Sequence, residues 1–500
     1  MLEKVIDDYI RELPEKNCCW FNRKWLKAKE FGELANNVTE ILKASGLTPG
    51  QRLAVLMPNS PVMLAVMYAT WKLGGVFCPL NEKTGEISLI KTLGLLKPFA
   101  VILSDGVKIE LEDALKNSGY VCSRFGTENL TGNENFKGVT APADDFDKTL
   151  AVIFSTSGTT GDPKAVPLTH ENILDNVKAC LEKLVDLTPD NSLLNVLPNF
   201  HAFGFTVCCV LPFVLKASQV LVASFMPPSN TLKAIEEAKP DVLLLVPTMI
   251  GFAASMLERQ GKKLTGIKVL IAGGDKYNTK MDDRVTAAFG VQLIEGYGIT
   301  ECSPVLSVNP TPAVRKLGTV GPALPRFELR LKSENGEELP IPGDGVLWCK
   351  GPSVTPGYYH APEINHERFI DGWFNTGDYV KIDEDGYISI LDRVTDIIIV
   401  GGFNVYPQEV ESILSEHPAV NTAVVVGTPN DMSGEVPKAF IIKEKDSEIT
   451  ERELVNFCKN RLSHYKVPRA IEFVESLPIS ATGKILRRVL RQQEREREKN

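Results

Sequence analysis

The sequence predicts an α/β protein, with a large N-terminal part of helix-covered sheets followed by a small α+β part. Three observations predict this fold class. First, a chain of 500 residues is too long for a single hydrophobic core. Second, strand and helix signals alternate over residues 1–80, as in parallel sheets covered by helices. Third, the pattern changes to short strands over residues 318–348, which predicts a small β-barrel-like piece, and to a compact α+β pattern over residues 397–500.

Composition excludes several classes of protein. Hydrophobic residues make up 43% and charged residues 24% of the chain, which is typical of globular domains. The net charge of -8 argues against a nucleic-acid binder that works through a general basic surface. The ten cysteines include no C-x-x-C pair, so neither a disulfide framework nor a zinc ribbon is indicated. We therefore expect reduced thiols in a cytoplasmic protein.

No membrane-spanning or secretion segment is expected. The first residues carry acids at Glu3, Asp7 and Asp8, where a signal peptide would be basic and then apolar. Three long uncharged runs occur, at residues 53–71, 191–215 and 242–257, and each is broken by proline. None has the pattern of a transmembrane helix, although peripheral contact with a membrane stays compatible with the sequence.

The N-terminal residues alternate between helix and strand. Apolar spacing predicts an amphipathic helix over residues 31–42, and residues 52–57 form an apolar strand. The next helix opens at residues 58–61 and ends near Gly74, before a strand over residues 76–80. Residues 105–148 give no clear pattern beyond a surface loop near residues 126–135.

A polar loop follows the apolar strand at residues 150–154. Residues 155–164 read S-T-S-G-T-T-G-D-P-K. Hydroxyls and backbone N–H groups in such a loop can bind an anion, and Lys164 adds a positive charge. An ordinary polar loop is the alternative. The loop is not a P-loop, because Pro163 stands where the spacing from Gly158 requires a second glycine.

Three further stretches follow predicted strands at the edge where parallel sheets bind ligands. His201 follows the strand at residues 193–197, and a packed core histidine is its alternative. The apolar residues 203–215 could line an acyl tunnel or belong to the core. Paired glycines at 273–274 follow a strand at 268–272 and would let a flat ligand approach the backbone.

The third stretch, residues 296–301, follows a strand at 291–295 and reads G-Y-G-I-T-E. Tyr297 can stack on a base, Thr300 can donate to a phosphate, and Glu301 is an oxygen ligand suited to Mg²⁺. Taken alone, the stretch could equally be a turn with a solvated acid.

In this order, the stretches resemble the signatures of the adenylate-forming superfamily, which includes acyl-CoA synthetases, nonribosomal adenylation domains and luciferases. The resemblance implies that ATP and AMP are bound by Thr156, Ser157, Gly158, Thr159, Thr160, Gly161, Lys164, Gly273, Gly274, Asp275, Gly296, Tyr297, Asp378 and Arg393. It implies catalytic roles for His201, Thr300, Glu301 and Lys484, with Mg²⁺ on Glu301. Gly401 and Gly402 would meet the pantetheine arm of the thiol acceptor.

The resemblance also implies two domains, over residues 1–394 and 395–500, with a hinge near Thr395 that makes the small domain mobile. The family more often has Asp or Lys at that position. From the residues alone, Asp378 could cap a turn and Arg393 could form a surface ion pair. Basic residues between 461 and 491 could dock an anionic thiol carrier or simply form a solvated helix face.

The implied function is an ATP-dependent ligase that activates a carboxylic acid as acyl-AMP and passes the acyl group to the thiol of CoA or acyl carrier protein. Residues 295–305 look most like those of bacterial fatty-acyl ligases, and residues 198–215 contain no acid that could anchor an amino group. A fatty acid is therefore favoured. The alternatives are an adenylation enzyme that loads an amino or aryl acid onto a carrier protein, a luciferase-like oxygenase, and a non-catalytic nucleotide sensor.

Overall fold

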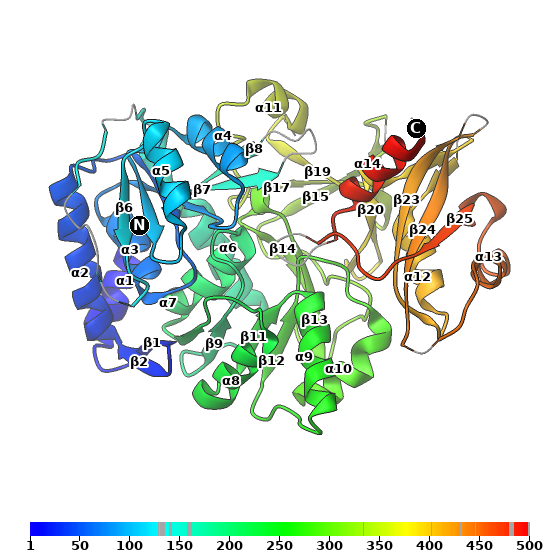
Figure 1. The fold of residues 1–500 in the computed structure, drawn as a ribbon, viewed down its shortest axis with the longest axis horizontal. Coiled ribbons are helices and arrows are strands. Elements are labelled where there is room, and N and C mark those ends of the chain that lie inside the picture. Colours follow the sequence, from blue (N-terminus) through cyan, green and yellow to red (C-terminus); the bar gives the residue numbers. More distant parts are fainter. Residues whose placement is uncertain are drawn as a thin grey trace. The chain divides into compact units, whose positions relative to one another are not determined.

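The fold consists of two compact units of unequal size. The structure is a computed structural model, and it describes residues 1–128, 130, 136–139, 143–157, 163–333, 335–401, 403–430, 433–445, 447–479 and 485–498, with the backbone alone at 156, 157, 163, 395 and 498. The larger unit contains Met1–Glu328 and Cys349–Phe374, and the smaller unit contains Leu329–Trp348 and Asn375–Asn500 (Figure 1). Of the helices described, none is long and apolar enough to cross a membrane.

The larger unit contains a six-stranded sheet in the order β6-β5-β3-β4-β7-β8. Its strands are β3 (Arg52–Leu56), β4 (Val76–Leu80), β5 (Ala100–Ser104), β6 (Cys122–Phe125), β7 (Leu150–Ser157) and β8 (Pro163–Thr169). The first five strands run parallel, and β8 turns back antiparallel to β7. All residues of β3, β4 and β5 are buried and most of them are apolar, as expected of parallel strands covered on both faces.

The second sheet of the larger unit has eight strands in the order β14-β13-β12-β11-β9-β10-β1-β2. Its strands are β1 (Asn17–Phe21), β2 (Lys24–Lys27), β9 (Ser192–Asn195), β10 (Ser218–Leu221), β11 (Val242–Leu245), β12 (Val269–Ala272), β13 (Leu293–Gly298) and β14 (Val305–Val308). Its central strands run parallel, and β2 and β14 close the edges antiparallel.

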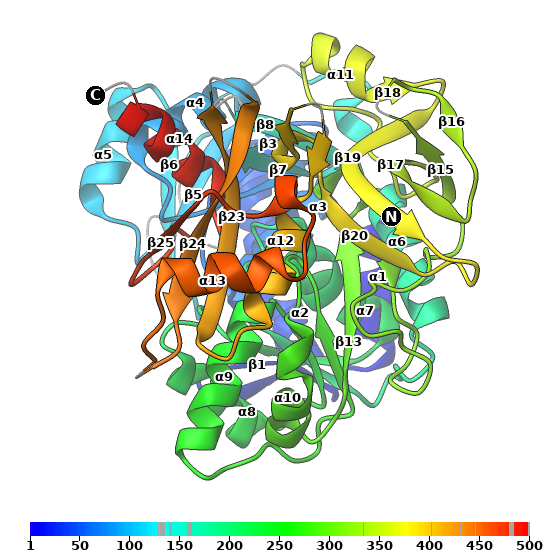
Figure 2. The same cartoon turned by 90° about the vertical axis from the view of Figure 1, so that its right-hand side faces the viewer.

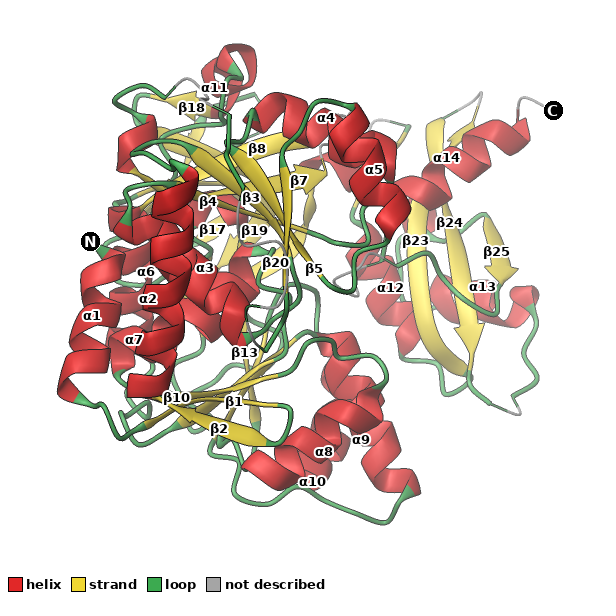
Figure 3. Ribbon diagram, turned by 60° about the vertical axis from the view of Figure 1, so that its left-hand side comes forward, coloured by secondary structure: helices red, strands yellow, loops and turns green. Residues whose placement is uncertain are grey.

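Helices cover both sheets and also fill the space between them (Figure 3). The inner helices are α1 (Leu2–Glu12), α2 (Ala28–Ser45), α3 (Pro61–Lys72), α6 (His170–Lys183) and α7 (Leu211–Leu215). The outer faces carry α4 (Glu86–Leu96) and α5 (Ile109–Asn117) on one sheet, and α8 (Pro228–Ala238), α9 (Pro247–Arg259) and α10 (Asp282–Phe289) on the other. A short helix α11 (Pro362–Arg368) and strand β18 (Phe369–Ile370) complete the unit.

The smaller unit contains two sheets that are mainly antiparallel. One has β15 (Glu328–Lys332), β16 (Glu338–Leu339), β17 (Gly343–Lys350), β19 (Trp373–Ile382) and β20 (Ile388–Arg393). The other has β21 (Ile398–Val400), β22 (Phe403–Val405), β23 (Val420–Asn430), β24 (Gly434–Lys443) and β25 (Ala470–Phe473). Helices α12 (Pro407–Ser415) and α13 (Glu451–Lys459) share one apolar core with this second sheet, and α14 (Arg487–Glu498) packs through Leu490 on Val424 and Phe440 (Figure 2).

The predicted α/β fold class is confirmed, including its larger N-terminal and smaller C-terminal parts. The predicted helix at 31–42 lies within α2, and the predicted strand at 76–80 is β4. One predicted strand is wrong, since residues 318–321 form a turn at two glycines with positive φ, Gly318 and Gly321. Residues 105–148, for which no clear sequence pattern was found, contain α5 and β6. The two compact units do not divide at the predicted domain boundary, 394/395. This boundary and the hinge near Thr395 remain predictions.

A buried ion pair ties together several parts of the larger unit. Arg52 Nη1 lies 3.0 Å from Asp147 Oδ2, and the two side chains are 2% and 5% exposed. Arg52 also donates to the carbonyls of Leu96 and Lys97 at the end of α4, and Asp147 accepts from the Tyr359 hydroxyl at 2.8 Å. The pair is buried but satisfied, so removing one partner would leave an uncompensated charge.

We expect the variant Asp147→Asn to lower the free energy of unfolding by about 3 kcal/mol, because Arg52 would keep its charge in a buried site. The change should be seen as a lower thermal midpoint. Lys148→Gln is the matched control, because it breaks the neighbouring exposed pair with Asp145 and should leave the midpoint unchanged. Equal midpoints for Asp147→Asn and wild type would contradict the role of the pair.

A buried carboxyl group lies on β13. The Glu295 residue is 8% exposed, and its Oε2 accepts the backbone N–H of Gly318 at 2.9 Å. Burial raises the pKa of this carboxyl group from 4.5 to about 7, and the N–H of Gly318 and the charge of Arg315 only partly oppose the rise. Between pH 4.5 and 7, this carboxyl group is therefore mostly protonated in the folded chain and mostly ionised in the unfolded chain.

This difference should make stability fall as pH rises. The free energy of unfolding should decrease by up to about 3 kcal/mol between pH 4.5 and 7 and then stay level with respect to this group. Glu295→Gln keeps an acceptor for Gly318 and carries no charge, so we expect it to be more stable than wild type at pH 8 and similar at pH 5. Thermal midpoints across this range test the prediction, with the exposed Glu328→Gln as control. Identical pH profiles for Glu295→Gln and wild type would refute it.

Candidate functional site

The polar loop joins the antiparallel strands β7 and β8. Thr156 pairs with Lys164, and Ser157 with Pro163, so the strands extend further than the sequence suggested. Lys164 therefore lies on β8 and is half-buried. The predicted phosphate-binding residues Gly158, Thr159, Thr160 and Gly161 lie outside the described residues, as do the side chains of Thr156 and Ser157.

Lys164 and Glu301 approach the same tyrosine, Tyr358. The hydroxyl of Tyr358 donates to Glu301 Oε1 at 2.6 Å, and Lys164 Nζ lies 5.6 Å from the centre of the tyrosine ring. The structure thus brings together two predicted site residues that are 137 positions apart in the sequence. Tyr358 itself was not predicted, because nothing local in its sequence signals these long-range partners.

Helix α6 holds the backbone on either side of this cluster. The buried Asn176 carboxamide donates to the carbonyls of Cys302 and Val305 at 3.0 and 2.7 Å and accepts the Val305 N–H. One turn earlier, Asn172 donates to the carbonyls of Pro352 and Val354. These bonds satisfy backbone groups at the start of β14 and in irregular segments, and so they fix the segments that carry Glu301 and Tyr358.

The predicted adenine-binding glycines meet at the carboxyl ends of β12 and β13. A side chain at Gly273 would come within 2.9 Å of the Phe203 ring and 3.5 Å of the Gly296 carbonyl. A side chain at Gly298 would come within 2.2 Å of the Pro304 carbonyl. Gly274 has φ +87°, and Asp275 accepts the N–H of Lys276 through its own side chain. Close backbone approach therefore requires glycine at Gly298, whereas a side chain at Gly273 would meet the Phe203 ring and would reach the Gly296 carbonyl only at van der Waals distance.

Thr300 and Tyr297 lie on the same stretch as these glycines. Tyr297 is half-buried on β13, where it pairs with Ser307 of β14. Thr300 is 9% exposed and starts the short 3-10 helix Thr300–Cys302, whose middle residue is Glu301. The Glu301 carbonyl accepts the N–H of Thr355 at 2.8 Å, which anchors the helix to the segment before Tyr358.

His201 lies in the turn after β9 and is half-buried. Its Nδ1 lies 3.4 Å from the backbone nitrogen of Phe203. The apolar residues that follow form a buried π-helix, Gly204–Val210, and then α7. Phe205 packs against the rings of Trp71, Phe77 and Phe154. These contacts assign Phe205 to the core between the sheets, so the core alternative describes it better than the tunnel.

Asp378 and Arg393 form an ion pair in the smaller unit. They face each other on β19 and β20, with Arg393 Nε 2.7 Å from Asp378 Oδ1. Asp378 is 2% exposed, and its N–H donates to the hydroxyl of Thr376. The ion pair that the sequence offered as an alternative for Arg393 is therefore present, with a second predicted site residue as its partner.

The predicted hinge region contains a buried carboxylate that the sequence did not suggest. Asp392 is 1% exposed and accepts the N–H groups of Gln408 at the start of α12 and of Arg393. Burial raises the pKa of Asp392 to about 6, although both N–H groups and the charge of Arg487 oppose the rise. Gly401 has φ +56° and donates to the Ser433 carbonyl, while Gly402 and Lys484 lie outside the described residues.

The basic residues near the C-terminus are largely paired with acids. Lys466 binds Glu409 at 2.6 Å, Arg487 binds Glu411 at 2.7 Å and Arg491 binds Asp396 at 2.6 Å. These contacts reduce the positive field that the sequence suggested for docking an anionic thiol carrier.

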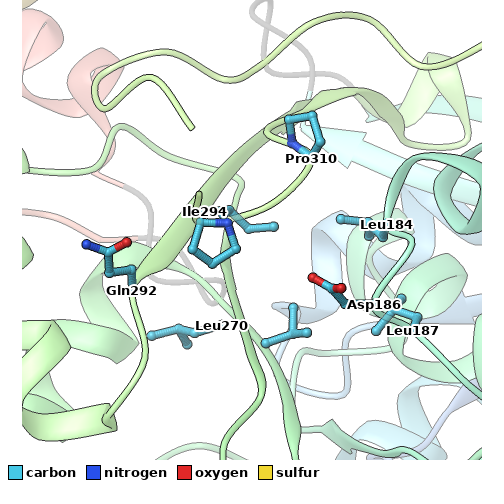
Figure 4. A pocket seen from close by; sticks show the side chains of 9 residues that line it. Leu184, Asp186, Leu187, Leu270, Gln292, Ile294 and Pro310 are labelled. Atoms are coloured by element: carbon cyan, nitrogen blue, oxygen red, sulfur yellow. The ribbon is translucent and has the colours of Figure 1, made fainter. Parts of the chain in front are cut away.

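A narrow pocket in the larger unit includes none of the predicted site residues (Figure 4). It is lined by Leu184, Asp186, Leu187, Val269, Leu270, Gln292, Ile294, Pro310 and Pro312. Its walls are mainly apolar, and Asp186 is its acidic side chain.

Within the described part of the chain, no three His, Cys, Asp or Glu side chains form a metal-binding group. Glu301 alone still fits Mg²⁺, which is commonly held by one or two carboxylates together with phosphate oxygens of the substrate.

Known proteins resemble this chain over nearly its whole length. The family of AMP-binding enzymes matches residues 6–359, and the C-terminal domain of AMP-binding enzymes matches residues 409–484. A long-chain-fatty-acid–CoA ligase of Bacillus subtilis is 33% identical over 99% of this chain and 95% of its own length. A feruloyl-CoA synthase of an Amycolatopsis species is 34% identical over 92% of this chain and 93% of its own.

Solved structures agree with this likeness. ATP-bound MatB from Rhodopseudomonas palustris is 30% identical, covers 99% of both chains and superposes with a TM-score of 0.87. The o-succinylbenzoate CoA synthetase of Bacillus subtilis, solved with its acyl-adenylate intermediate, is 26% identical over 98% of this chain and 97% of its own, with a TM-score of 0.83. Both the family matches and the relatives show that this chain belongs to the AMP-binding enzymes, a family of AMP-forming acyl-CoA ligases.

Proposed function

We propose that this enzyme activates a fatty acid with ATP, forms acyl-AMP and pyrophosphate, and then transfers the acyl group to a thiol in the cytoplasm. The observation that carries the proposal is the likeness to the long-chain-fatty-acid–CoA ligase along 99% of the chain. CoA is the favoured acceptor, and acyl carrier protein is the other one to be tested.

The first half-reaction requires charge stabilisation around the phosphates rather than a protein nucleophile. Lys164, Thr300 and the loop at 155–164 would bind the phosphates of ATP. Mg²⁺, when bound, would neutralise charge on the phosphate oxygens. The Glu301 carboxylate would hold this ion, which is supported by its half-buried position and by the Tyr358 hydroxyl that donates to it.

The base and the ribose of the nucleotide would be bound by separate groups of residues. A flat base would lie against the backbone of Gly273 and Gly296, which carry no side chains, with Tyr297 stacking on it and Gly274 and Asp275 alongside. The paired Asp378 and Arg393 would bind the ribose hydroxyls and a phosphate. His201 would border the substrate carboxylate.

Lys484 would contact the carboxylate and the phosphates during adenylation, while Gly401 and Gly402 would meet the pantetheine arm during thioester formation. In these assignments, one part of the C-terminal domain serves adenylation and another part serves thioester formation. Rotation about a hinge near Thr395 would exchange them, which is the reason for proposing a mobile domain.

An aryl acid is the second candidate substrate, because the feruloyl-CoA synthase is as similar to this chain as the fatty-acid ligase. The packed surroundings of Phe205 add no support for an acyl tunnel at that residue.

Substrate choice can be tested by AMP release with octanoate, palmitate, ferulate and phenylalanine, each combined with CoA or with holo acyl carrier protein. We expect the highest kcat/KM with a fatty acid and CoA, because a relative that matches 99% of this chain bears that name. Reactions without a thiol are the control. Activity with ferulate or phenylalanine but with neither fatty acid would reject the proposed substrate.

The role of Lys484 can be tested with Lys484→Ala. We expect acyl-AMP formation to fall by at least about 100-fold, because the developing charge loses a positive partner, while thioester formation from supplied acyl-AMP continues. Lys459→Ala, an exposed lysine on α13, is the control and should leave both steps unchanged. If both half-reactions of Lys484→Ala fell equally, a role specific to adenylation would be excluded.

A further inference from the structure

Tyr358 occupies a restrained position between two segments of the candidate site. Its residue is 5% exposed, and its backbone is held on both sides by the carboxamide of Asn365, which accepts the Tyr358 N–H at 2.6 Å and donates to the Tyr358 carbonyl at 2.9 Å. The ring also packs edge-on against Phe369, with ring centres 6.1 Å apart. These contacts fix both the backbone and the plane of the ring.

The next residue anchors the segment in the core. The Tyr359 N–H donates to the carbonyl of Ala165 on β8 at 2.9 Å, and its hydroxyl donates to Asp147, the partner of Arg52. Tyr358 therefore stands on a segment that is tied to the strand of Lys164 and to the buried ion pair. A hydroxyl held in this way has a defined position.

That hydroxyl donates to one oxygen of Glu301. At 2.6 Å, the bond has the short length typical of a hydroxyl that donates to a carboxylate. The bond restricts the rotation of the carboxylate. On the face of the same ring, the Lys164 ammonium gains a cation–π contact. One side chain thus touches both the proposed metal ligand and a proposed phosphate ligand.

We propose that Tyr358 is a positioning residue. Its hydroxyl orients the Glu301 carboxylate for a divalent cation, and its ring keeps the Lys164 ammonium in place. The inference rests on the proposed role of Glu301 as metal ligand. Ligating carboxylates in proteins are themselves held by hydrogen bonds, and loss of such a bond typically weakens metal binding by about 10- to 100-fold. The donor here is the Tyr358 hydroxyl, which belongs to none of the motifs found in the sequence.

The test measures metal binding directly and needs no turnover. Mn²⁺ replaces Mg²⁺ and is titrated, by electron paramagnetic resonance of the free ion, into the full-length protein saturated with α,β-methylene ATP, which cannot transfer its adenylyl group. Tyr358→Phe keeps the ring and removes only the hydroxyl. We expect its Mn²⁺ Kd to rise about tenfold with an unchanged thermal midpoint, and saturating Mg²⁺ should restore much of its adenylation rate.

Two further variants separate the possible results. Tyr359→Phe removes the neighbouring hydroxyl from Asp147 and should lower the thermal midpoint without changing the Mn²⁺ Kd. Glu301→Gln should weaken Mn²⁺ binding at least as much as Tyr358→Phe. If Glu301→Gln weakens binding and Tyr358→Phe does not, the positioning role is wrong and the metal assignment stands. If Glu301→Gln has no effect, the metal assignment fails and the inference fails with it.

Discussion

Irregular backbone near the candidate site is held by two carboxamides, those of Asn172 and Asn176. Segments that leave a sheet carry carbonyl and N–H groups that neither strands nor helices pair, and a buried unpaired group costs stability. Asn172 satisfies carbonyls just before Tyr358, and Asn176 satisfies the turn just after Glu301. Both side chains lie on α6, which begins where β8 ends. The hairpin that carries Lys164 thus leads directly into the helix that fixes its neighbours.

Much of the fold could be predicted because its signals are local. Apolar runs such as residues 52–57 and 76–80 are buried strands, and the proline after residue 246 begins α9. The glycine pair at 273–274 was also predictable, because it directly follows the apolar strand β12. The Gly-Gly turn and the stretch that ends in Glu301 could be picked out for that reason.

Residues that act through distant partners could not be predicted in the same way. Tyr358 meets Glu301 across 57 positions, and Asn176 meets Cys302 across 126. Asp392 accepts the N–H of Gln408 at the start of α12, a contact that no local sequence pattern indicates. Periodicity also could not separate a tunnel wall from core at Phe205, since both are apolar, and the surrounding aromatic rings decide for core.

The charge pairs of the smaller unit have a consequence for how an acceptor arrives. A paired lysine or arginine acts at a distance as a weak dipole, and the field of a dipole decays faster than that of a single charge. Lys466, Arg487 and Arg491 each lie within salt-bridge distance of an acid. Long-range attraction of an anionic thiol carrier to this unit is therefore weakened. Recognition would then rest on contacts made after collision rather than on steering before it.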